Sequence, residues 1–470
     1  MKPTLQLLSL EECQAIADAT FRLLARVGVK VTEPEAAHRL ASAGARLDGE
    51  QVFIPADLVR RALSTAPRSV SIYSRDGQIA MRLEGRQAYF GAHTDAPDVL
   101  DPYTHARRPC LEADVARHAR LADALPHINF VTASGLVADR PADRADRIAL
   151  AQCLCHSAKP VLVMPVSLSA LEDIGAMAAL AVGGPDALRA RPNIVVYAEP
   201  VSPLVHPDES LRKLLLCAGR GWPVVYSPFA AMGGTAPQSL PALLAQLCAE
   251  SLSAVVVHQL AAPGAPFIFG GMASVMDMRT TVFSYGAPEF QLGNALMAEM
   301  AHFFDLPNFG TAGTSDAQTF DGQAVVEAVT SCLLASLTGA HLVHDVGLLG
   351  NATVIMPEMI TATDEMVAML KHLLGEVPVN AETLSLELFA ETGKHREFIT
   401  QPYTLEHMHD VWYPSLLYRG GAKAWAASAQ ETYEQRVNAR TRRLMDTHRP
   451  APLPPGIAEQ LAAIAAGEQS

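Results

Sequence analysis

Short apolar segments recur along the middle of the chain, and each is followed by small or polar residues and then by a long stretch rich in Ala and Leu. Segments that are apolar throughout are typical of parallel strands buried on both faces. Successive segments are separated by roughly 30 to 43 residues, the length of one strand–helix unit. Eight such units predict an α/β fold with a closed (β/α)8 TIM barrel, and a doubly wound open sheet is the alternative. The segments are residues 88–91, 130–133, 161–164, 194–197, 224–226, 267–269, 308–311 and 341–343.

The chain before residue 87 is predicted to be mostly helical. Ser9 is suited to cap a first amphipathic helix, and a second helix is expected over residues 34–43, which Gly44 can end. Short strands are predicted on either side of the second helix, at 29–31 and 52–54. We therefore expect residues 1–86 to form an N-terminal extension of the barrel.

The strand rhythm ends after residue 350. Residues 365–374 and 424–444 have helical patterns, and a proline-rich segment at 449–455 precedes a last short helix. No stretch of the chain reads as a linker between independent domains. The sequence thus predicts a barrel over residues 87–350 and a C-terminal helical segment over 351–470 that packs on it.

Composition and charge narrow the classes of function. Hydrophobic residues make up 49% of the 470 residues, which is enough for a large core. A net charge of −13 argues against nucleic-acid binding, because phosphate contacts need clustered Lys and Arg. Acidic residues interrupt the first 28 positions, which excludes a secretory signal, and the apolar stretches look too short to span a bilayer. We expect a cytoplasmic protein without membrane association.

The seven cysteines form neither a disulfide framework nor a zinc pattern. The sequence Cys-Leu-Cys-His at residues 153–156 lacks a second pair of ligands. We therefore predict reduced cysteines, as in the cytosol, and no tightly bound metal.

The active site of a TIM barrel lies at the carboxyl ends of its strands. The residues that follow the predicted strands are polar, but they do not match the active site of a common hydrolase. The residues expected there are His93, Thr94 and Asp95; Ser134; Met164 and Pro165; Glu199 and Pro200; Ser227 and Pro228; Gly270 and Gly271; Thr314, Ser315 and Asp316; and His344 and Asp345.

Three familiar barrel chemistries are not supported. A metal-dependent amidohydrolase needs His-x-His on the first strand, whereas His407 and His409 fall after the barrel. A Schiff-base lysine is not expected, because Lys159 precedes its strand. Glu199 and Asp316 could be paired carboxylates, but their neighbours do not indicate a sugar cleft.

The last strand segment carries two histidines, His341 and His344. Residues three apart point to opposite faces of an ideal strand, so both can line one pocket only if the strand ends between them. The alternative is one packed histidine and one in a surface loop. Asp345 is placed to orient His344.

Several aromatic residues fall near the predicted strand ends. Aromatic faces attract quaternary ammonium groups, by up to about 2 kcal/mol each when desolvated. The alternative is that they belong to the core, as most barrel aromatics do. They are Tyr89, Phe90, Tyr226, Phe229, Tyr285 and Phe320.

A set of local motifs, in this order along nearly the whole chain, resembles the trimethylamine methyltransferase (MttB) family. Each motif alone would be weak, and together they are specific. They are AMGGTAP at 231–237, QLCAE at 246–250, PGAP at 263–266, MDMR at 276–279, YGAPE at 285–289, GTSD at 313–316 and DGQA at 321–324.

The resemblance implies a barrel whose mouth binds a methylated amine. A separate corrinoid protein would dock over that mouth and present cobalt(I) to the N-methyl group. The enzyme would then contribute positioning, water exclusion and management of charge. We also expect a homo-oligomer.

The substrate class follows from a departure from the founding members, which carry pyrrolysine. This sequence has only the standard twenty residues, and we place the corresponding position in the loop at 316–318. The branch of the family without pyrrolysine includes enzymes acting on glycine betaine, so we predict a quaternary amine, with glycine betaine, proline betaine, carnitine and choline-like compounds as candidates.

The resemblance also assigns the predicted substrate contacts. Members acting on glycine betaine have two histidines three apart on a late strand, which His341 and His344 match. Arg279 is an alternative carboxylate partner, unless it only pairs with Asp277. The remaining predicted contacts include Glu199 and Asp316, which balance the ammonium charge unless they only bond to backbone at strand ends. The others are Tyr89, His93, Tyr226, Gln318 and Phe320.

Two other functions stay open. One is a tertiary-amine methyltransferase or a barrel methyltransferase that uses a folate-linked methyl carrier. The other is a non-catalytic protein that binds methylamines or a corrinoid.

Overall fold

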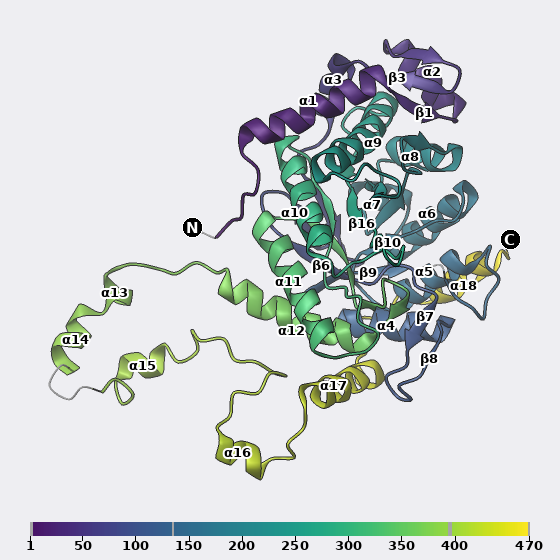
Figure 1. Ribbon diagram of the computed structural model, residues 1–470. Helices are drawn as coiled ribbons and strands as arrows, with labels where there is room; N and C mark the ends of the chain where they lie inside the picture. The colour runs from purple at the N-terminus through teal and green to yellow at the C-terminus, as the bar shows by residue number, and fades with distance from the viewer. Residues whose placement is uncertain (1–2, 134–135, 393–396, 469–470) are drawn as a thin grey trace.

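Eight parallel strands form a closed ring at the centre of the molecule (Figure 1). The computed structural model describes residues 3–133, 136–392 and 397–468. Seven neighbouring pairs of strands are joined by parallel ladders, with register shifts on both sides of β6, and a bridge between Phe269 and Asn308 closes the ring between the sixth and seventh strands. The strands are β6 (Tyr89–Ala92), β9 (Ile128–Ala133), β10 (Val161–Val163), β11 (Ile194–Ala198), β13 (Val224–Tyr226), β15 (Phe267–Phe269), β17 (Phe309–Thr311) and β18 (Leu342–Val346).

A helix follows each of these strands and packs on the outside of the ring, which confirms the predicted (β/α)8 barrel (Figure 1). One additional short helix, α7 (Pro185–Ala190), lies between α6 and β11. The eight barrel helices are α4 (Glu112–Ala124), α5 (Ala145–His156), α6 (Leu168–Val182), α8 (Asp208–Arg220), α9 (Leu240–Ala261), α10 (Pro288–Phe303), α11 (Gly322–Thr338) and α12 (Pro357–Leu373).

One end of the barrel is closed by the hairpin of β4 (Val70–Tyr73) and β5 (Ile79–Leu83). Apolar side chains of this hairpin join the core inside the barrel, which includes Phe130, Leu162 and Leu342. The backbone around the hairpin bonds to residues just before β10 and β11, so the hairpin lies at the amino ends of the strands. The site must therefore open at the other end.

The N-terminal extension covers α9. Its helices α1 (Leu10–Arg26), α2 (Pro34–Ser42) and α3 (Ala56–Thr65) pack on the outer face of α9, and the barrel covers its inner face. The capping box of Ser9 confirms the predicted start of α1. At 22 residues α9 is long and apolar enough to cross a membrane, contrary to the expectation from sequence, but 83% of its apolar window is buried in the protein. Its apolar character therefore belongs to a core helix.

Short sheets also attach the extension and line the carboxyl ends of the barrel strands. In the extension, β1 (Val29–Val31), β2 (Arg46–Asp48) and β3 (Gln51–Phe53) join β12 (Val205–His206) of the barrel. The loops after β13 and β15 pair as β14 (Phe229–Met232) and β16 (Met272–Val275). The loops after β6 and β18 form a sheet of β7 (Asp98–Leu100), β8 (Arg107–Pro109), β19 (Leu348–Leu349) and β20 (Val354–Ile355).

The C-terminal segment has two parts. Helices α17 (Tyr433–Thr447) and α18 (Ile457–Ala466) pack on the barrel helices. Four short helices extend away from the barrel: α13 (Ala381–Leu384), α14 (Leu386–Thr392), α15 (Pro402–Glu406) and α16 (Ala422–Ala427) (Figure 1).

The helix predicted over 424–444 differs from the structure. It is interrupted between α16 and α17, because the backbone of Gln430 is left-handed and the side chain of Thr432 caps a new helix. The helix predicted over 365–374 is the second half of α12, which already begins at Pro357.

Candidate active site

The carboxyl ends of the barrel strands bring together a cluster of tyrosine, histidine and acidic side chains. Tyr197 and Glu199 come from the end of β11, Tyr285 from the loop between β16 and α10, and His344 and Asp345 from β18. Burial raises the pKa of both phenols, and the charges of Glu199 and Asp345 raise it further. We call these five residues the mouth cluster.

Tyr197 and Glu199 face the same side of β11 because they are two residues apart. The Tyr197 hydroxyl donates to Oε2 of Glu199 at 2.8 Å. Glu199 reaches solvent, yet the surrounding protein displaces enough water to raise its pKa, although the Tyr197 hydroxyl and the charge of Lys213 lower it. An accessible acid with a raised pKa at a barrel mouth is typical of a functional site.

His344 is held in one orientation by its neighbours. Its Nδ1 donates to the carbonyl of Gly310 at 2.7 Å, its Nε2 lies 3.2 Å from Oδ2 of Asp345, and its ring stacks on Phe309 with 4.0 Å between centroids. Asp345 has a left-handed backbone, with φ of 76°, and its Oδ1 accepts from the Thr94 hydroxyl at 2.5 Å. Backbone strain of this kind persists where the surroundings impose it, often at functional sites.

Asp316 positions the loop that carries Tyr285. Its carboxylate accepts from the backbone N–H of Tyr285 at 2.8 Å and of Gly286 at 3.0 Å. The Ser284 hydroxyl at 2.5 Å and the Asn351 side chain at 3.0 Å also donate to it. With four donors, two on each oxygen, Asp316 is occupied by protein groups and orients Tyr285 over the mouth.

His341 and Tyr89 lie at the amino ends of their strands, far from the mouth cluster. His341 precedes β18; its Nδ1 accepts from the backbone of Asn308 at 3.1 Å and its Nε2 donates to the carbonyl of Gly85 at 3.0 Å. Burial lowers the pKa of His341 to about 4. The Tyr89 hydroxyl donates to Gln87 at 3.0 Å beside the closing hairpin. The structure does not bring His341 and His344 into one pocket, because β18 continues through His344.

Two more predicted contacts have other partners. The Tyr226 side chain lies outside the ring, 2.8 Å from Nδ1 of buried His206. Arg279 is 89% exposed and pairs with Asp277 at 3.0 Å, as the structural alternative predicted. Ser134, expected at a strand end, lies outside the described residues.

The remaining predicted contacts surround the mouth without joining the cluster. His93 is buried and packs edge-on against His118 of α4, with 5.0 Å between ring centroids. Gln318 is exposed and donates to a backbone carbonyl of its own loop. Phe320 is buried and stacks on Tyr433 of α17.

Tyr197 and Asp345 complete the mouth cluster, although the strand-end pattern does not single them out as substrate contacts. A signal for Tyr197 exists: it stands two residues before Glu199, so both must share one face of a strand that ends there. Asp345 was expected at a strand end and as a partner of His344, and its Oδ2 lies 3.2 Å from Nε2 of His344 as predicted; its left-handed backbone was not predicted.

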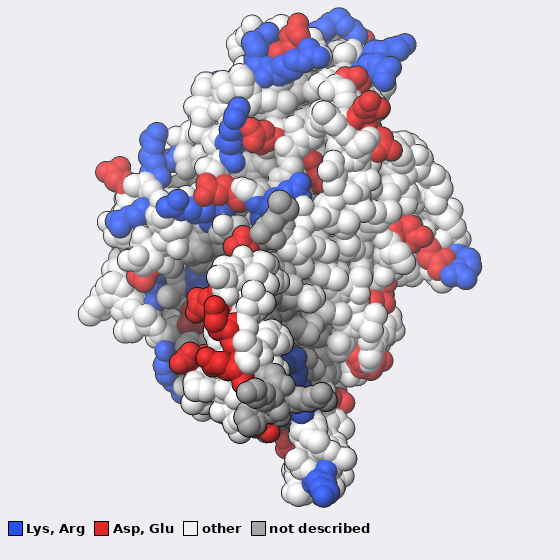
Figure 2. Space-filling model, turned by 90° about the vertical axis from the view of Figure 1, so that its left-hand side faces the viewer, with Lys and Arg blue, Asp and Glu red and all other residues white. Residues whose placement is uncertain are grey.

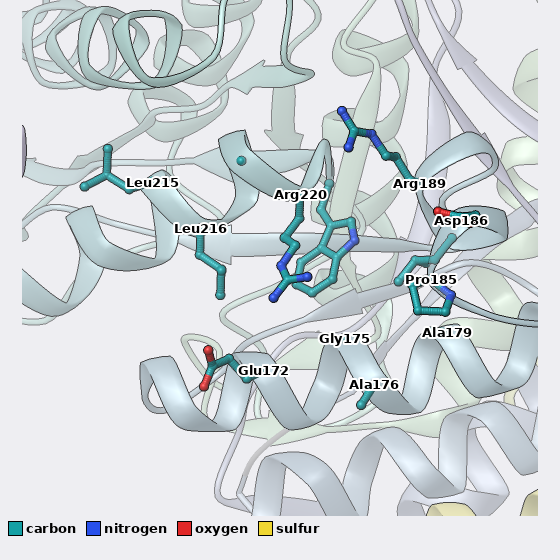
Figure 3. A pocket seen from close by; sticks show the side chains of 13 residues that line it. Glu172, Gly175, Ala176, Ala179, Pro185, Asp186, Arg189, Leu215, Leu216 and Arg220 are labelled. Carbon is teal, nitrogen blue, oxygen red and sulfur yellow. The ribbon is translucent and has the colours of Figure 1, made fainter.

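A separate cavity of about 650 Å³ lies on the flank of the barrel between α6 and α8 (Figure 3). Glu172 and Ala176 of α6 lie on one side of it, and Leu215, Leu216 and Arg220 of α8 lie on the other (Figure 3). The lining contains no residue of the mouth cluster and none of the predicted contacts. This cavity is not part of the candidate site.

Within the described ranges, no group of three or more His, Cys, Asp or Glu side chains is arranged to hold a metal ion. All seven cysteines are free thiols. The chemistry of the mouth cluster is therefore that of acidic, aromatic and imidazole groups.

Comparison with known sequences gives matches over the full length. A family model described as trimethylamine methyltransferase (MTTB) matches residues 1–469. The trimethylamine methyltransferase MttB of Desulfitobacterium hafniense (strain DSM 10664 / DCB-2) is 28% identical over 97% of this chain and 92% of its own. The glycine betaine methyltransferase of Desulfitobacterium hafniense (strain Y51) is 26% identical over 99% of this chain and 97% of its own.

Among solved structures, the monomethylamine methyltransferase of Methanosarcina barkeri aligns with 97% of this chain and 86% of its own. The TM-score is 0.49 and the sequence identity is 9%.

Proposed function

The chain belongs to the trimethylamine methyltransferase family, as the resemblance predicted, and we propose that it transfers a methyl group from a quaternary amine to the corrinoid cofactor of a separate protein. Glycine betaine or a similar betaine is the proposed substrate. The glycine betaine methyltransferase among its relatives supports this class, since it matches almost the whole chain.

The observation that carries the proposal is the combination of carboxylates and aromatic rings in the mouth cluster. A quaternary ammonium has no N–H to donate, so a protein recognises it through negative charge and aromatic faces. Glu199 and Asp345 supply negative charge next to the rings of Tyr197 and Tyr285. The raised pKa of Glu199 is a further sign that this acid lacks full compensation by the protein itself.

A betaine also has a carboxylate, and Tyr285 is the donor we assign to it. The Tyr285 hydroxyl has no hydrogen-bond partner within the part of the chain that the structure describes. Because burial raises the pKa of this phenol, it stays protonated and can donate. Asp316 holds its backbone in place.

In the proposed reaction the residues of the chain bind and orient. The corrinoid, held by its own protein, supplies the nucleophile that takes the methyl group. A quaternary amine leaves as a neutral tertiary amine, so no acid is needed to protonate it. The mouth cluster contributes by fixing the N–CH₃ bond in line with the acceptor and by excluding water around the cation.

We also propose that the protein is cytoplasmic and that it is a homo-oligomer. Seven free cysteines support the location, because the cytosol keeps thiols reduced. The corrinoid protein is proposed to dock over the carboxyl ends of the strands, where the mouth cluster lies.

The test is methyl transfer to reduced cobalamin, followed by the absorbance change of the corrinoid. Glycine betaine, proline betaine, carnitine and trimethylamine are compared at equal concentration. We expect methylation with a betaine and none with trimethylamine. Turnover with trimethylamine alone would replace the quaternary substrate with a tertiary one, which the trimethylamine methyltransferase among the relatives makes the second candidate. Methylation of a folate carrier would refute the corrinoid as methyl acceptor. Binding of the amine without turnover, in the presence of the cognate corrinoid protein, would refute the proposal that the protein is an enzyme.

A further inference from the structure

The segment that follows α12 extends away from the barrel as an arm (Figure 1). We define the arm as residues 373–392 and 397–418. Both ends are attached to the barrel. One end is the end of α12, and at the other end the carboxylate of Glu365 accepts backbone N–H groups of Ser415, Leu416 and Leu417 at 2.5 to 3.1 Å, with Leu416 buried. The arm is thus attached to the barrel at both ends, and the chain between these attachments extends away from the barrel.

The arm is unusually apolar for a surface. Of the 26 large hydrophobic side chains that are exposed in the described chain, 14 lie in the arm. They include Val377 at 82% exposure, Ile399 at 81%, Leu386 and Leu405 at 70% and Phe389 at 59%. Monomeric proteins rarely expose apolar groups in this concentration, which mark surfaces that another molecule covers.

The helices of the arm cannot be stable by themselves. α13, α14 and α15 have four, seven and five residues, and isolated helices this short are marginal in water. Among them only Thr392 is buried. Contacts within the arm, such as the edge-to-face pair of Phe389 and Phe398 with 5.4 Å between ring centroids, are few, so covering by another molecule would add to the stability of this conformation.

We propose that the arm packs on a second copy of this chain and forms the interface of a homo-oligomer. This inference deepens the proposed oligomer and does not depend on the methyl-transfer reaction. Surface this apolar needs to be covered at all times, and a second copy is always present at equal concentration. A transient partner would leave the arm exposed between encounters. Permanent homodimer interfaces are accordingly more apolar than transient ones.

The size of the apolar surface agrees with this partner. Half-exposed side chains of this size each present on the order of 100 Å². Fourteen of them therefore present on the order of 1,000 Å², compared with about 800 Å² per partner in a stable interface of standard size. The arm alone can supply one side of such an interface.

Charge supports the same partner. The two described parts of the arm have seven acidic residues and no Lys or Arg, and the sequence between them adds Lys394 and Arg396, so residues 373–418 carry seven acidic against two basic residues. Figure 2, which views the molecule from the side of the arm, shows Asp and Glu side chains grouped in the lower half, whereas toward the upper end Lys and Arg stand among Asp and Glu. A second copy can place Lys and Arg side chains of its upper end against the acidic arm, which pairs opposite charges.

The test is the molar mass of the full chain in solution, measured by light scattering after size-exclusion chromatography. We expect wild type to have at least twice the 50.2 kDa mass of one chain. The combined variant Leu386→Ser, Phe389→Ser and Leu405→Ser should shift to the monomer mass, and its far-ultraviolet circular dichroism spectrum should lose no more helix signal than the short arm helices account for. The control Val166→Ser removes a side chain of 52% exposure outside the arm and should keep the wild-type mass.

A benzophenone photocrosslinker in place of Phe389 gives a second readout that does not depend on the variants folding. It should form a product of twice the chain mass from purified protein. A monomeric wild type would overturn the proposal. The arm would then either pack on its own barrel or bind a different protein. An oligomer whose mass survives the triple substitution, without a crosslink from position 389, would also overturn it.

Discussion

Replacing Glu199 with Gln removes a negative charge from the mouth cluster and keeps its shape. The glutamine amide oxygen can still accept the hydrogen bond from Tyr197. If a permanent cation binds beside Glu199, the Glu199→Gln variant binds it more weakly. Because burial raises the pKa of Glu199, the wild-type affinity for a cation should be full above this pKa and fall as the pH is lowered through it, whereas the variant should lose this pH dependence.

The magnitude follows from the distance of closest approach and from solvent access. The methyl groups keep a quaternary nitrogen roughly 5 Å from a carboxylate oxygen, where two unit charges interact by about 0.8 kcal/mol in water and about 3 kcal/mol at an effective dielectric constant of ~20. Glu199 reaches solvent, so its interaction falls between these limits. We expect a loss of roughly 1 to 2 kcal/mol, or about 5- to 30-fold in Kd.

Calorimetric titration with tetramethylammonium measures this loss, because that ion has the charge of a betaine but no carboxylate. The control Glu172→Gln removes another exposed acid, on the flank of the barrel, and should leave the Kd unchanged. Wild-type affinity for tetramethylammonium in Glu199→Gln at pH 8 would refute the assignment of Glu199 to the cation site. So would an equal loss in the control.

The same substitution should have the opposite effect on stability. A carboxyl group with a raised pKa in the folded protein favours its protonated form, so its contribution is full below the ordinary pKa of 4.5 and is lost as the pH rises through the folded pKa. Glu199→Gln should therefore melt at a higher temperature than wild type at pH 8, and the difference should vanish near pH 4. A lower Tm at pH 8 would show that the folded protein stabilises the carboxylate.

Three further predictions concern the barrel and its histidines. A Cβ on Gly91 would lie 2.1 Å from ring atoms of Phe130, so Gly91→Ala should cost about 1 to 3 kcal/mol of unfolding free energy by denaturant titration, and an unchanged midpoint would contradict this packing. His344→Ala should weaken substrate binding, whereas His341→Ala at the opposite end of the barrel should lower Tm and keep the substrate Kd; the reverse result would move the site. Burial lowers the pKa of His93 from 6.5 to about 4, so folding stability should fall by about 3 kcal/mol as the pH drops from 6.5 to 4, and His93→Gln should flatten that slope.

The barrel could be predicted because its strands have a distinctive pattern. A parallel strand inside a ring of helices is apolar on both faces, as residues 161–163 and 224–226 are, and a helix follows each strand at a regular distance. The arm gave no comparable signal. Its short apolar runs look like ordinary core helices, and their exposure depends on a partner that the sequence of one chain does not reveal.

The site was harder to predict because side-chain direction depends on where a strand begins and ends. Tyr89 is the first residue of β6 and so falls at the closed end, although its segment was correctly predicted as a strand. His341 and His344 were predicted as a pair, but β18 begins after the first and continues past the second. The polar residues within β18 hide its length, and the left-handed turn at Asp345 cannot be read from the side-chain pattern.

The covering of α9 by the N-terminal extension has a consequence for synthesis of the protein. Thr20 donates to the carbonyl of Ala245 at 3.2 Å, a contact between residues 225 positions apart. The ribosome therefore makes α1, α2 and α3 long before the helix on which they pack, and contacts this distant in sequence form slowly. Until they close, a growing chain presents apolar faces on both sides of the future contact. We expect the nascent chain to need chaperones. A version that lacks the N-terminal extension and begins at the barrel should aggregate through the uncovered face of α9.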